Sequence, residues 1–196
     1  MNSKKIAVFA SGRGSNLQAL LEAFPTSHAQ AEIALVICNK RDADALERAR
    51  NAGVEAVYIA WKKGGQLEFE TQAQRLLENS KIDLICLAGF MRLLSSEFTE
   101  RWTGKMLNIH PSLLPKYVGL EAQKQALEAG ERHTGATVHF VDSGLDSGEI
   151  VLQDQLEILP GDTVASLSER LLLLEHALYP EAVRRVLERN GPHPGP

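Results

Sequence analysis

A continuous apolar run, Ile6-Ala7-Val8-Phe9-Ala10, leads directly into the polar stretch Ser11-Gly12-Arg13-Gly14-Ser15-Asn16. Such a run is typical of a buried β-strand, and the glycines and serines after it indicate a loop. Apolar residues then recur at helical spacing, at Leu17, Leu20, Leu21 and Phe24. This part of the chain therefore predicts a strand, a loop and a helix in succession.

The loop between the predicted strand and helix has the residues of an anion site. Glycine permits close approach of a ligand to the backbone, and a helix N-terminus presents free N–H groups to a negative charge. We therefore expect Gly14, Ser15 and Asn16 to hold a phosphate group. A turn in which Ser15 or Asn16 only caps the helix is the alternative. NAD binding is disfavoured, because a dinucleotide fingerprint needs glycine in place of Leu17 and an acidic residue near Cys38-Asn39-Lys40.

The alternation of apolar runs and helical patterns continues along the chain. Further strands are predicted at residues 33–38, 56–59, 82–87 and 105–107, with helical patterns after the first three strands of the chain. Residues 136–141 and 150–152 predict two more strands, antiparallel to the rest, and Asp162-Thr163 predicts the cap of a long final helix. The fold class is therefore α/β: a Rossmann-like, mostly parallel twisted sheet with helices on both faces and a final antiparallel strand region.

Composition narrows the class of protein. The 196 residues are 44% hydrophobic and 23% charged, which predicts one globular domain over residues 1–188 and a flexible tail at 189–196. The formal net charge of −4 gives no basic footprint for nucleic acid, and no apolar run has the length of a membrane span. The first apolar run is too short for a signal peptide. Cys38 and Cys86 lie in apolar segments without ligand spacing, so we expect buried free thiols and a cytoplasmic location.

Asn108-Ile109-His110-Pro111 carries a candidate catalytic pair directly after a predicted strand. Residues two apart in a strand face the same side, so Asn108 and His110 are expected to point into one cavity at the carboxyl end of the sheet. A carboxamide donor beside an imidazole suits an oxyanion. A purely structural role for both side chains is the alternative.

Other polar features of the second half are less specific. Residues 142–149 form an acidic loop that is either part of the site or a simple polar turn, and His139 is interpreted as a hydrogen-bonded core histidine. Histidines and carboxylates show no metal-binding spacing, so we predict no metal. Residues 111–133 are expected to be the mobile part of the site, since Gly119 and Gly130 interrupt any regular element.

Six motifs occur together in this order: Gly12-x-Gly14-Ser15-Asn16, Leu87-Ala88-Gly89-Phe90-Met91-Arg92, Asn108-Ile109-His110-Pro111-Ser112-Leu113-Leu114-Pro115-Lys116, Gly135-x-Thr137-Val138-His139-Phe140-Val141, Leu145-Asp146-x-Gly148 and Glu175-His176-x-x-Tyr179-Pro180. Together they resemble phosphoribosylglycinamide formyltransferase, the folate-dependent enzyme of purine synthesis. The resemblance covers about residues 5–185.

The resemblance implies a reaction and a set of residues. The formyl group of 10-formyltetrahydrofolate, a co-substrate, would pass to the amine of 5′-phosphoribosylglycinamide in de novo purine synthesis. The implied catalytic residues are Asn108, His110 and Asp146. The implied contacts to the nucleotide are Gly14, Ser15 and Asn16 at the phosphate and Glu175 at its ribose or phosphate end. The implied folate contacts are Met91, Arg92, Leu93, Leu94, Asn108, Asp142, Ser143, Gly144 and Leu145.

The chain departs from the family pattern in three places. Family members usually have proline and then histidine in the segment that here includes Val118 and Glu121, and often a polar residue where this chain has Leu172. One phosphate contact is therefore expected to be missing. An arginine often found after the third strand has no match in residues 62–66, so the residue that holds the glutamate tail of the folate is not identified.

Other functions stay open as alternatives. Methionyl-tRNA formyltransferase and formyltetrahydrofolate hydrolase share the catalytic trio, but each normally carries an extra domain for which we expect no room here. A nucleotide-binding module that kept the fold and lost activity is a further alternative. We expect small-molecule substrates, no nucleic acid or membrane partner, and a monomer or weak homodimer.

Formyl transfer puts negative charge on the formyl oxygen as the amine attacks. Asn108 and protonated His110 are the expected donors to that oxygen, and a nearby Asp146 would favour the imidazolium. The proton lost by the amine reaches the folate nitrogen through His110, Asp146 or a water. No serine or cysteine is placed for a covalent intermediate, so direct transfer is expected.

Overall fold

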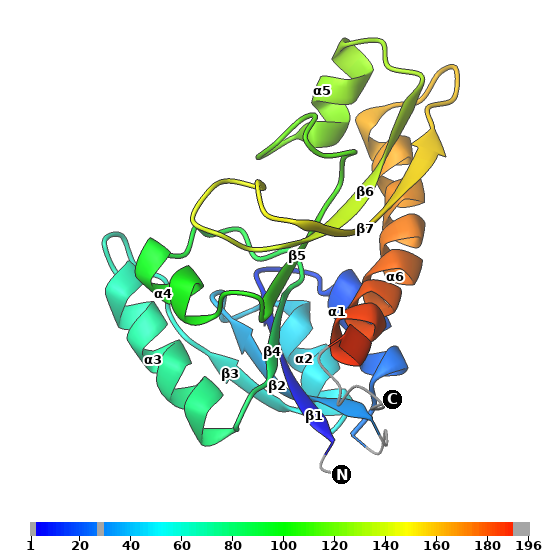
Figure 1. Cartoon of the computed structure of the whole chain (residues 1–196). Coiled ribbons are helices and arrows are strands. Elements are labelled where there is room, and N and C mark those ends of the chain that lie inside the picture. Colours follow the sequence, from blue (N-terminus) through cyan, green and yellow to red (C-terminus); the bar gives the residue numbers. More distant parts are fainter. Residues whose placement is uncertain (1–2, 27–29, 190–196) are drawn as a thin grey trace, which may run out of the picture.

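The computed structural model describes residues 3–26 and 30–189, which form a twisted sheet with helices on both sides (Figure 1). The strands are β1 (Lys4–Ala10), β2 (Ala31–Cys38), β3 (Glu55–Tyr58), β4 (Leu84–Leu87), β5 (Met106–His110), β6 (His133–Phe140) and β7 (Ile150–Glu157). Their order in the sheet is β3-β2-β1-β4-β5-β6-β7. The pairs from β3 to β5 are parallel, whereas β6 and β7 pair antiparallel. The predicted fold class is confirmed.

Two apolar cores lie on opposite faces of this sheet. Ile6 and Val8 of β1 point into one core, and the alternate residues Ala7 and Phe9 point into the other. The continuous apolar run of β1 is thus explained by burial on both faces. The first core is covered by α1 (Ser15–Ala23), α2 (Asp44–Asn51) and α6 (Val164–Arg189). The second core is covered by α3 (Gln66–Asn79) and α4 (Ser96–Arg101).

The sequence prediction was incomplete at several elements. It omitted α4 and also α5 (Ala122–Glu128), which lies within the segment 111–133 that was expected to lack regular structure. The predicted strand 105–107 continues through His110, so Asn108 and His110 lie within β5, and β7 continues five residues beyond the predicted end at Leu152. The missed part of β7 is polar and largely exposed, because this edge strand pairs only with β6. α5 buries only the small side chains of Ala122 and Ala126, which give a weak apolar pattern.

Predictions about the cysteines and the last helix are confirmed. Cys38 and Cys86 are free and buried, as predicted, and burial raises the pKa of Cys86 to about 12. The cap of α6 is also confirmed, since Ser166 N–H donates to the Thr163 hydroxyl at 3.2 Å. The helix runs to Arg189, one residue into the expected tail, and residues 190–196 lie outside the described part of the chain.

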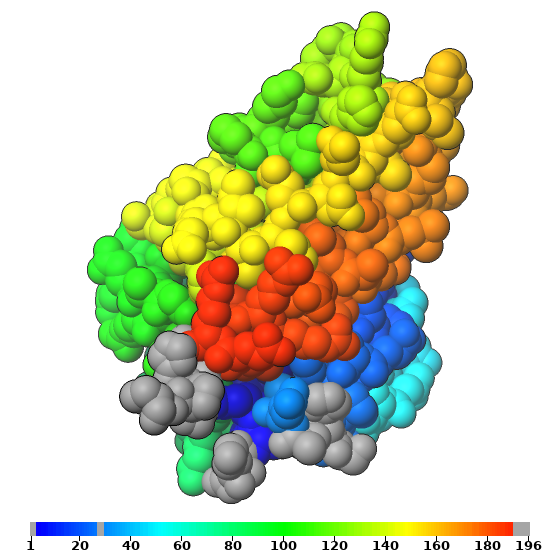
Figure 2. Space-filling view, turned by 45° about the vertical axis from the view of Figure 1, so that its right-hand side comes forward, coloured from blue at the N-terminus to red at the C-terminus, as the bar shows by residue number. Residues whose placement is uncertain are grey.

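The long helix α6 connects the two ends of the molecule. It packs on α1, β6 and β7, and its outer side is visible between the blue and yellow parts of the surface (Figure 2). Tyr179 in this helix is fully buried, and its hydroxyl lies 3.1 Å from the carbonyl oxygens of both Leu87 and Leu107. Leu87 is the last residue of β4 and Leu107 lies near the start of β5, so Tyr179 links α6 to both strands.

Removal of the Tyr179 hydroxyl should destabilise the fold. In Tyr179→Phe the ring still fills its space, but buried carbonyl oxygens lose their donor, which typically costs about 1–3 kcal/mol. We expect the free energy of unfolding in urea to fall by that amount. Tyr58→Phe is the control, since its half-buried ring lies under Arg41 and does not join α6 to the sheet. Equal stability of the two variants would contradict the role given to the hydroxyl.

Candidate active site

The site is built at the carboxyl end of β5. Asn108 and His110 alternate with Ile109 on this strand, and they therefore share one side of the sheet, as predicted. On the neighbouring strand β6, His139 lies directly opposite Asn108 in the antiparallel register. His110 and His139 are 5% and 2% exposed, so both imidazoles are removed from bulk water.

Asp146 reaches these residues from the loop between β6 and β7. Its Oδ2 lies 3.3 Å from His110 Nδ1, and its Oδ1 lies 3.6 Å from His139 Nε2. The backbone N–H of Gly119 donates to Oδ2 at 2.8 Å, and Asn108 Nδ2 donates to Oδ1 at 3.4 Å. The backbone of Asp146 is left-handed, with φ of 50°, a conformation that aspartate and asparagine tolerate better than most residues. The structure thus brings together Asn108, His110 and Asp146.

The charge on Asp146 follows from these contacts. Burial alone would raise the pKa of this carboxyl group, but the contacts with His139 and the Gly119 N–H, with the nearby charge of His110, lower it below its ordinary value. Asp146 therefore stays ionised throughout the neutral pH range.

The two ring nitrogens of His110 both face acceptors. Nδ1 faces the Asp146 carboxylate, and Nε2 lies 2.8 Å from the backbone carbonyl oxygen of Tyr117. A carbonyl oxygen only accepts, as does an ionised carboxylate, so both contacts are satisfied only when both nitrogens carry a proton. Asp146 and Tyr117 thus hold the ring of His110 from both sides.

His139 has the opposite arrangement. Its Nδ1 lies 2.8 Å from the carbonyl oxygen of Phe140, and its Nε2 lies 3.2 Å from the amide nitrogen of Asn108. These partners suit a neutral ring that donates from Nδ1 and accepts at Nε2. The amide N–H bonds of Asn108 are thereby directed at His139 and Asp146. His139 is a hydrogen-bonded buried histidine, as interpreted from the sequence, but it also belongs to the site.

The glycine loop packs against α2. Gly14 has a φ of 71° and caps the N-terminus of α1, and a Cβ atom there would lie 2.9 Å from the Cα of Ala45. Arg48 donates from Nε to the carbonyl oxygen of Arg13 at 2.8 Å, which fixes the other side of the loop. The first turn of α1 has no side-chain cap, so its N–H groups are available to an anion.

Asn16 and Glu175 meet beside this helix end. Asn16 Nδ2 donates to Glu175 Oε2 at 2.6 Å, although the two residues are 159 positions apart in the sequence. Burial raises the pKa of Glu175, and the hydrogen bond from Asn16 partly offsets that effect. The buried Oδ1 of Asn16 has no hydrogen-bond partner among the described residues. This oxygen is therefore an acceptor beside the glycine loop that could still receive a hydrogen bond from a ligand.

The segment after β4 is joined to the glycine loop. Met91 N–H donates to the Ser11 hydroxyl at 2.9 Å, and Gln66 donates to the carbonyl oxygen of Leu93 at 3.0 Å. Met91 and Leu93 are 62% and 71% exposed, and the guanidinium of Arg92 lies over the ring of Trp61. Leu94, by contrast, packs partly against the second core. Exposed apolar side chains at the carboxyl edge of the sheet form a surface suited to a flat ring system.

The loop 142–145 has an ordered internal structure. Asp142 Oδ1 accepts hydrogen bonds from Gly144 N–H at 2.9 Å and from the Ser147 hydroxyl at 2.8 Å. Ser143 and Leu145 are exposed, and Leu145 lies next to Gly119. The loop therefore does more than connect two strands, because it carries Asp146 into the site. Within the described residues no group of histidines, cysteines and carboxylates has the arrangement of a metal site, and no helix there is long and apolar enough to cross a membrane.

Comparisons with known proteins agree with this geometry. A family model described as formyl transferase matches residues 4–183. The phosphoribosylglycinamide formyltransferase of Haemophilus influenzae is 43% identical over 182 residues, which are 92% of this chain and 86% of that protein. The trifunctional purine biosynthetic protein adenosine-3 of Drosophila melanogaster is 49% identical over 183 residues, but this chain spans only 14% of its length. The crystal structure of glycinamide ribonucleotide transformylase 1 from Symbiobacterium toebii has a TM-score of 0.90 at 43% identity, with 95% of this chain and 89% of that chain covered.

The sheet with its antiparallel end and the cluster at β5 define the class of protein, and the chain belongs to the formyl transferase family. Within that family it belongs with the phosphoribosylglycinamide formyltransferases, which are enzymes of purine biosynthesis.

Several contacts of the site had no signal in the sequence. The Tyr117 carbonyl and the Gly119 N–H are backbone groups, so their participation depends on the path of the segment after β5. The link from Ser11 to Met91 crosses between two loops. For His139 the sequence did contain a signal. It lies in a predicted strand with an alternating pattern, and antiparallel pairing of that strand with β5 could have placed it opposite Asn108.

A substitution at Gly14 should weaken phosphate binding. Gly14→Ala would force an L-residue into a left-handed conformation against the backbone of α2, which typically costs about 1–2 kcal/mol and would displace the N–H groups of the loop. We expect the affinity for ribose 5-phosphate, measured by calorimetry on folded protein, to fall about tenfold or more. Gly12→Ala is the control, because a Cβ there meets no atom within 4 Å. Equal losses in the two variants would count against the assignment.

Proposed function

We propose that the chain transfers the formyl group of 10-formyltetrahydrofolate to the amine of 5′-phosphoribosylglycinamide, giving formylglycinamide ribonucleotide and tetrahydrofolate. The observation that carries the proposal is the contact of Asp146 with His110 beside Asn108, at the carboxyl end of β5. Open α/β sheets bind ligands at this edge. The similarity to phosphoribosylglycinamide formyltransferases supports the choice of substrates.

The reaction needs an amine nucleophile and an electrophilic formyl carbon. The amine nitrogen forms a bond to the formyl carbon, the formyl oxygen becomes negatively charged, and the bond from that carbon to the folate nitrogen then breaks. The amine loses one proton and the departing folate nitrogen gains one. A group in the site must therefore accept a proton from the amine and donate a proton to that nitrogen. Asp146 and His110 are the titratable pair in the site that meets this need.

His110 and Asn108 stabilise the charged oxygen. The imidazolium of His110 is preorganised by Asp146, so its Nε2–H is ready when the formyl oxygen takes the place of the Tyr117 carbonyl. Asn108 would redirect one of its amide N–H bonds from Asp146 or His139 to the same oxygen. Removal of one such donor elsewhere has cost about 3 kcal/mol of transition-state stabilisation.

The two substrates contact different segments of the chain. The phosphate of the nucleotide binds the N–H groups of Gly14, Ser15 and Asn16, and Glu175 accepts hydrogen bonds from its ribose. The folate lies between residues 91–94, with the side chains Met91, Arg92, Leu93 and Leu94, and the loop 142–145. The exposed side chains of Met91 and Leu145 support this placement.

We also propose that residues 1–188 act as one domain in the cytoplasm, as a monomer or weak homodimer with small-molecule substrates and no metal. The two cores share one continuous sheet, which supports a single folding unit.

A formyl-transfer assay on the purified chain tests the proposal. The chain should convert phosphoribosylglycinamide in the presence of 10-formyltetrahydrofolate, and it should not release formate from the folate at a comparable rate. Failure of transfer by a folded chain that binds both substrates would contradict the assigned function.

Asp146→Asn tests the electrostatic part of the mechanism. Asparagine tolerates the left-handed backbone of this position, so the fold should be kept. A neighbouring carboxylate stabilises the imidazolium, so without it the ring loses its proton at lower pH. If the imidazolium is the active form, the high-pH limb of the rate profile should move to lower pH, and kcat at pH 7 should fall about a hundredfold or more. An unmoved limb would show that Asp146 does not set the state of His110.

A further inference from the structure

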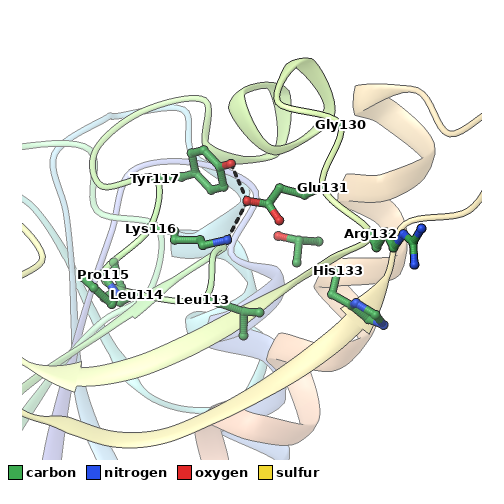
Figure 3. Close-up of a pocket in the computed structure, with 10 residues that line it drawn as sticks. Leu113, Leu114, Pro115, Lys116, Tyr117, Gly130, Glu131, Arg132 and His133 are labelled. Atoms are coloured by element: carbon green, nitrogen blue, oxygen red, sulfur yellow. Dashed lines mark hydrogen bonds and ion pairs between the residues drawn. The ribbon is translucent and has the colours of Figure 1, made fainter.

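Glu131 forms a small polar cluster outside the active site. It lies two residues before β6, at the far end of the segment that leaves β5. Its Oε1 accepts hydrogen bonds from Lys116 Nζ at 2.6 Å and from the Tyr117 hydroxyl at 2.8 Å, as the dashed lines in Figure 3 show. The two donors are consecutive residues of the segment after β5. These hydrogen bonds, with that from Lys116 the larger influence, lower the pKa of Glu131, so the carboxylate is ionised at neutral pH.

Tyr117 connects this cluster to the catalytic histidine. Its side-chain hydroxyl is bound to Glu131, while its backbone carbonyl oxygen lies 2.8 Å from His110 Nε2. The backbone φ of Tyr117 is 57°, a left-handed conformation that is unfavourable for a bulky residue. The segment must therefore be held in this conformation by other contacts, and the hydrogen bond to Glu131 restrains the tyrosine side chain.

The neighbours of Tyr117 are fixed by other means. The Lys116 carbonyl oxygen accepts from the Ser112 hydroxyl at 2.6 Å, and Gly119 N–H donates to Asp146 at 2.8 Å. These contacts hold the segment on either side of Tyr117 but do not reach its ring. Rotation of the peptide group between Tyr117 and Val118 would remove the carbonyl from His110 and leave both contacts in place, so they do not by themselves fix its direction.

We propose that Glu131 is a positioning residue for the catalytic imidazole. By binding the Tyr117 hydroxyl it holds the Tyr117 carbonyl against Nε2 of His110, and it thereby helps to keep the ring doubly protonated before substrate arrives. The proposal rests on the catalytic role proposed for His110. The carbonyl occupies the position that the formyl oxygen takes in the reaction, so Glu131 acts on the free enzyme more than on the substrate complex.

The other groups that face His110 do not replace this contact. Asp146 faces Nδ1 rather than Nε2, and His139 lies beyond Asp146 on the neighbouring strand. Among the contacts of the described residues, the Tyr117 carbonyl is the acceptor at Nε2.

The direct test is an NMR titration of the His110 ring in the free protein. Tyr117→Phe removes only the hydroxyl, and Glu131→Ala removes its acceptor. In each, the carbonyl would be less well held and the protonated ring less stabilised, so the titration midpoint should fall by about half to one pH unit. Glu131→Gln keeps an acceptor oxygen and should retain most of the wild-type behaviour. Lys124→Met is the matched control, because it breaks an exposed pair with Glu121 in the same segment.

Kinetics supply a second readout. The pH profile of kcat/KM reports the free enzyme, whereas that of kcat reports the substrate complex. In Tyr117→Phe and Glu131→Ala the high-pH limb of kcat/KM should move with the NMR midpoint, and the limb of kcat should move less. Wild-type midpoints in both folded variants, or an equal shift in Lys124→Met, would overturn the proposal. The titration uses no substrate, so it decides this inference even if the wild-type chain fails to transfer formyl groups.

Discussion

The buried carboxylate of Asp146 is the group around which the site is assembled. A charge removed from water is costly unless donors surround it, and here the donors come from separate parts of the chain. β5 supplies His110 and Asn108, and the segment after β5 supplies the Gly119 N–H, while His139 of β6 accepts from Asn108. The antiparallel pairing of β5 with β6 is what brings these strands together, so the departure from an all-parallel sheet serves the site directly.

The resting site has its donors already engaged by protein acceptors. The ring nitrogens of His110 face Asp146 and the Tyr117 carbonyl, while Asn108 is directed at His139 and Asp146. In the proposed reaction, the formyl oxygen replaces a protein acceptor rather than water at these donors. Neither neutral form of His110 satisfies both of its neighbours, which only accept hydrogen bonds.

Local sequence patterns predicted the fold class and much of the candidate site, and the contacts that they missed depend on backbone geometry. The apolar run at β1, the alternation around Asn108 and His110, and the glycine loop before α1 predicted the fold class and the edge of the sheet that carries the site. The contact of Asn16 with Glu175 was expected only through resemblance, because nothing local relates residues 159 positions apart. The carbonyl of Tyr117 could not be predicted, since any residue has one and its direction depends on a left-handed φ angle. The helix α5 was missed because its buried residues are alanines.

A double-mutant cycle measures the central claim, that Asp146 and His110 act as one unit. The rate of formyl transfer is compared in the wild type, Asp146→Asn, His110→Ala and the double variant, with circular dichroism to confirm the fold of each. If the carboxylate acts by maintaining the imidazolium, its loss should matter little once the ring is absent, so the double variant should be scarcely slower than the slower single variant. Fully additive losses in activation free energy would contradict the account, because they would mean that the two side chains, 3.3 Å apart, contribute independently.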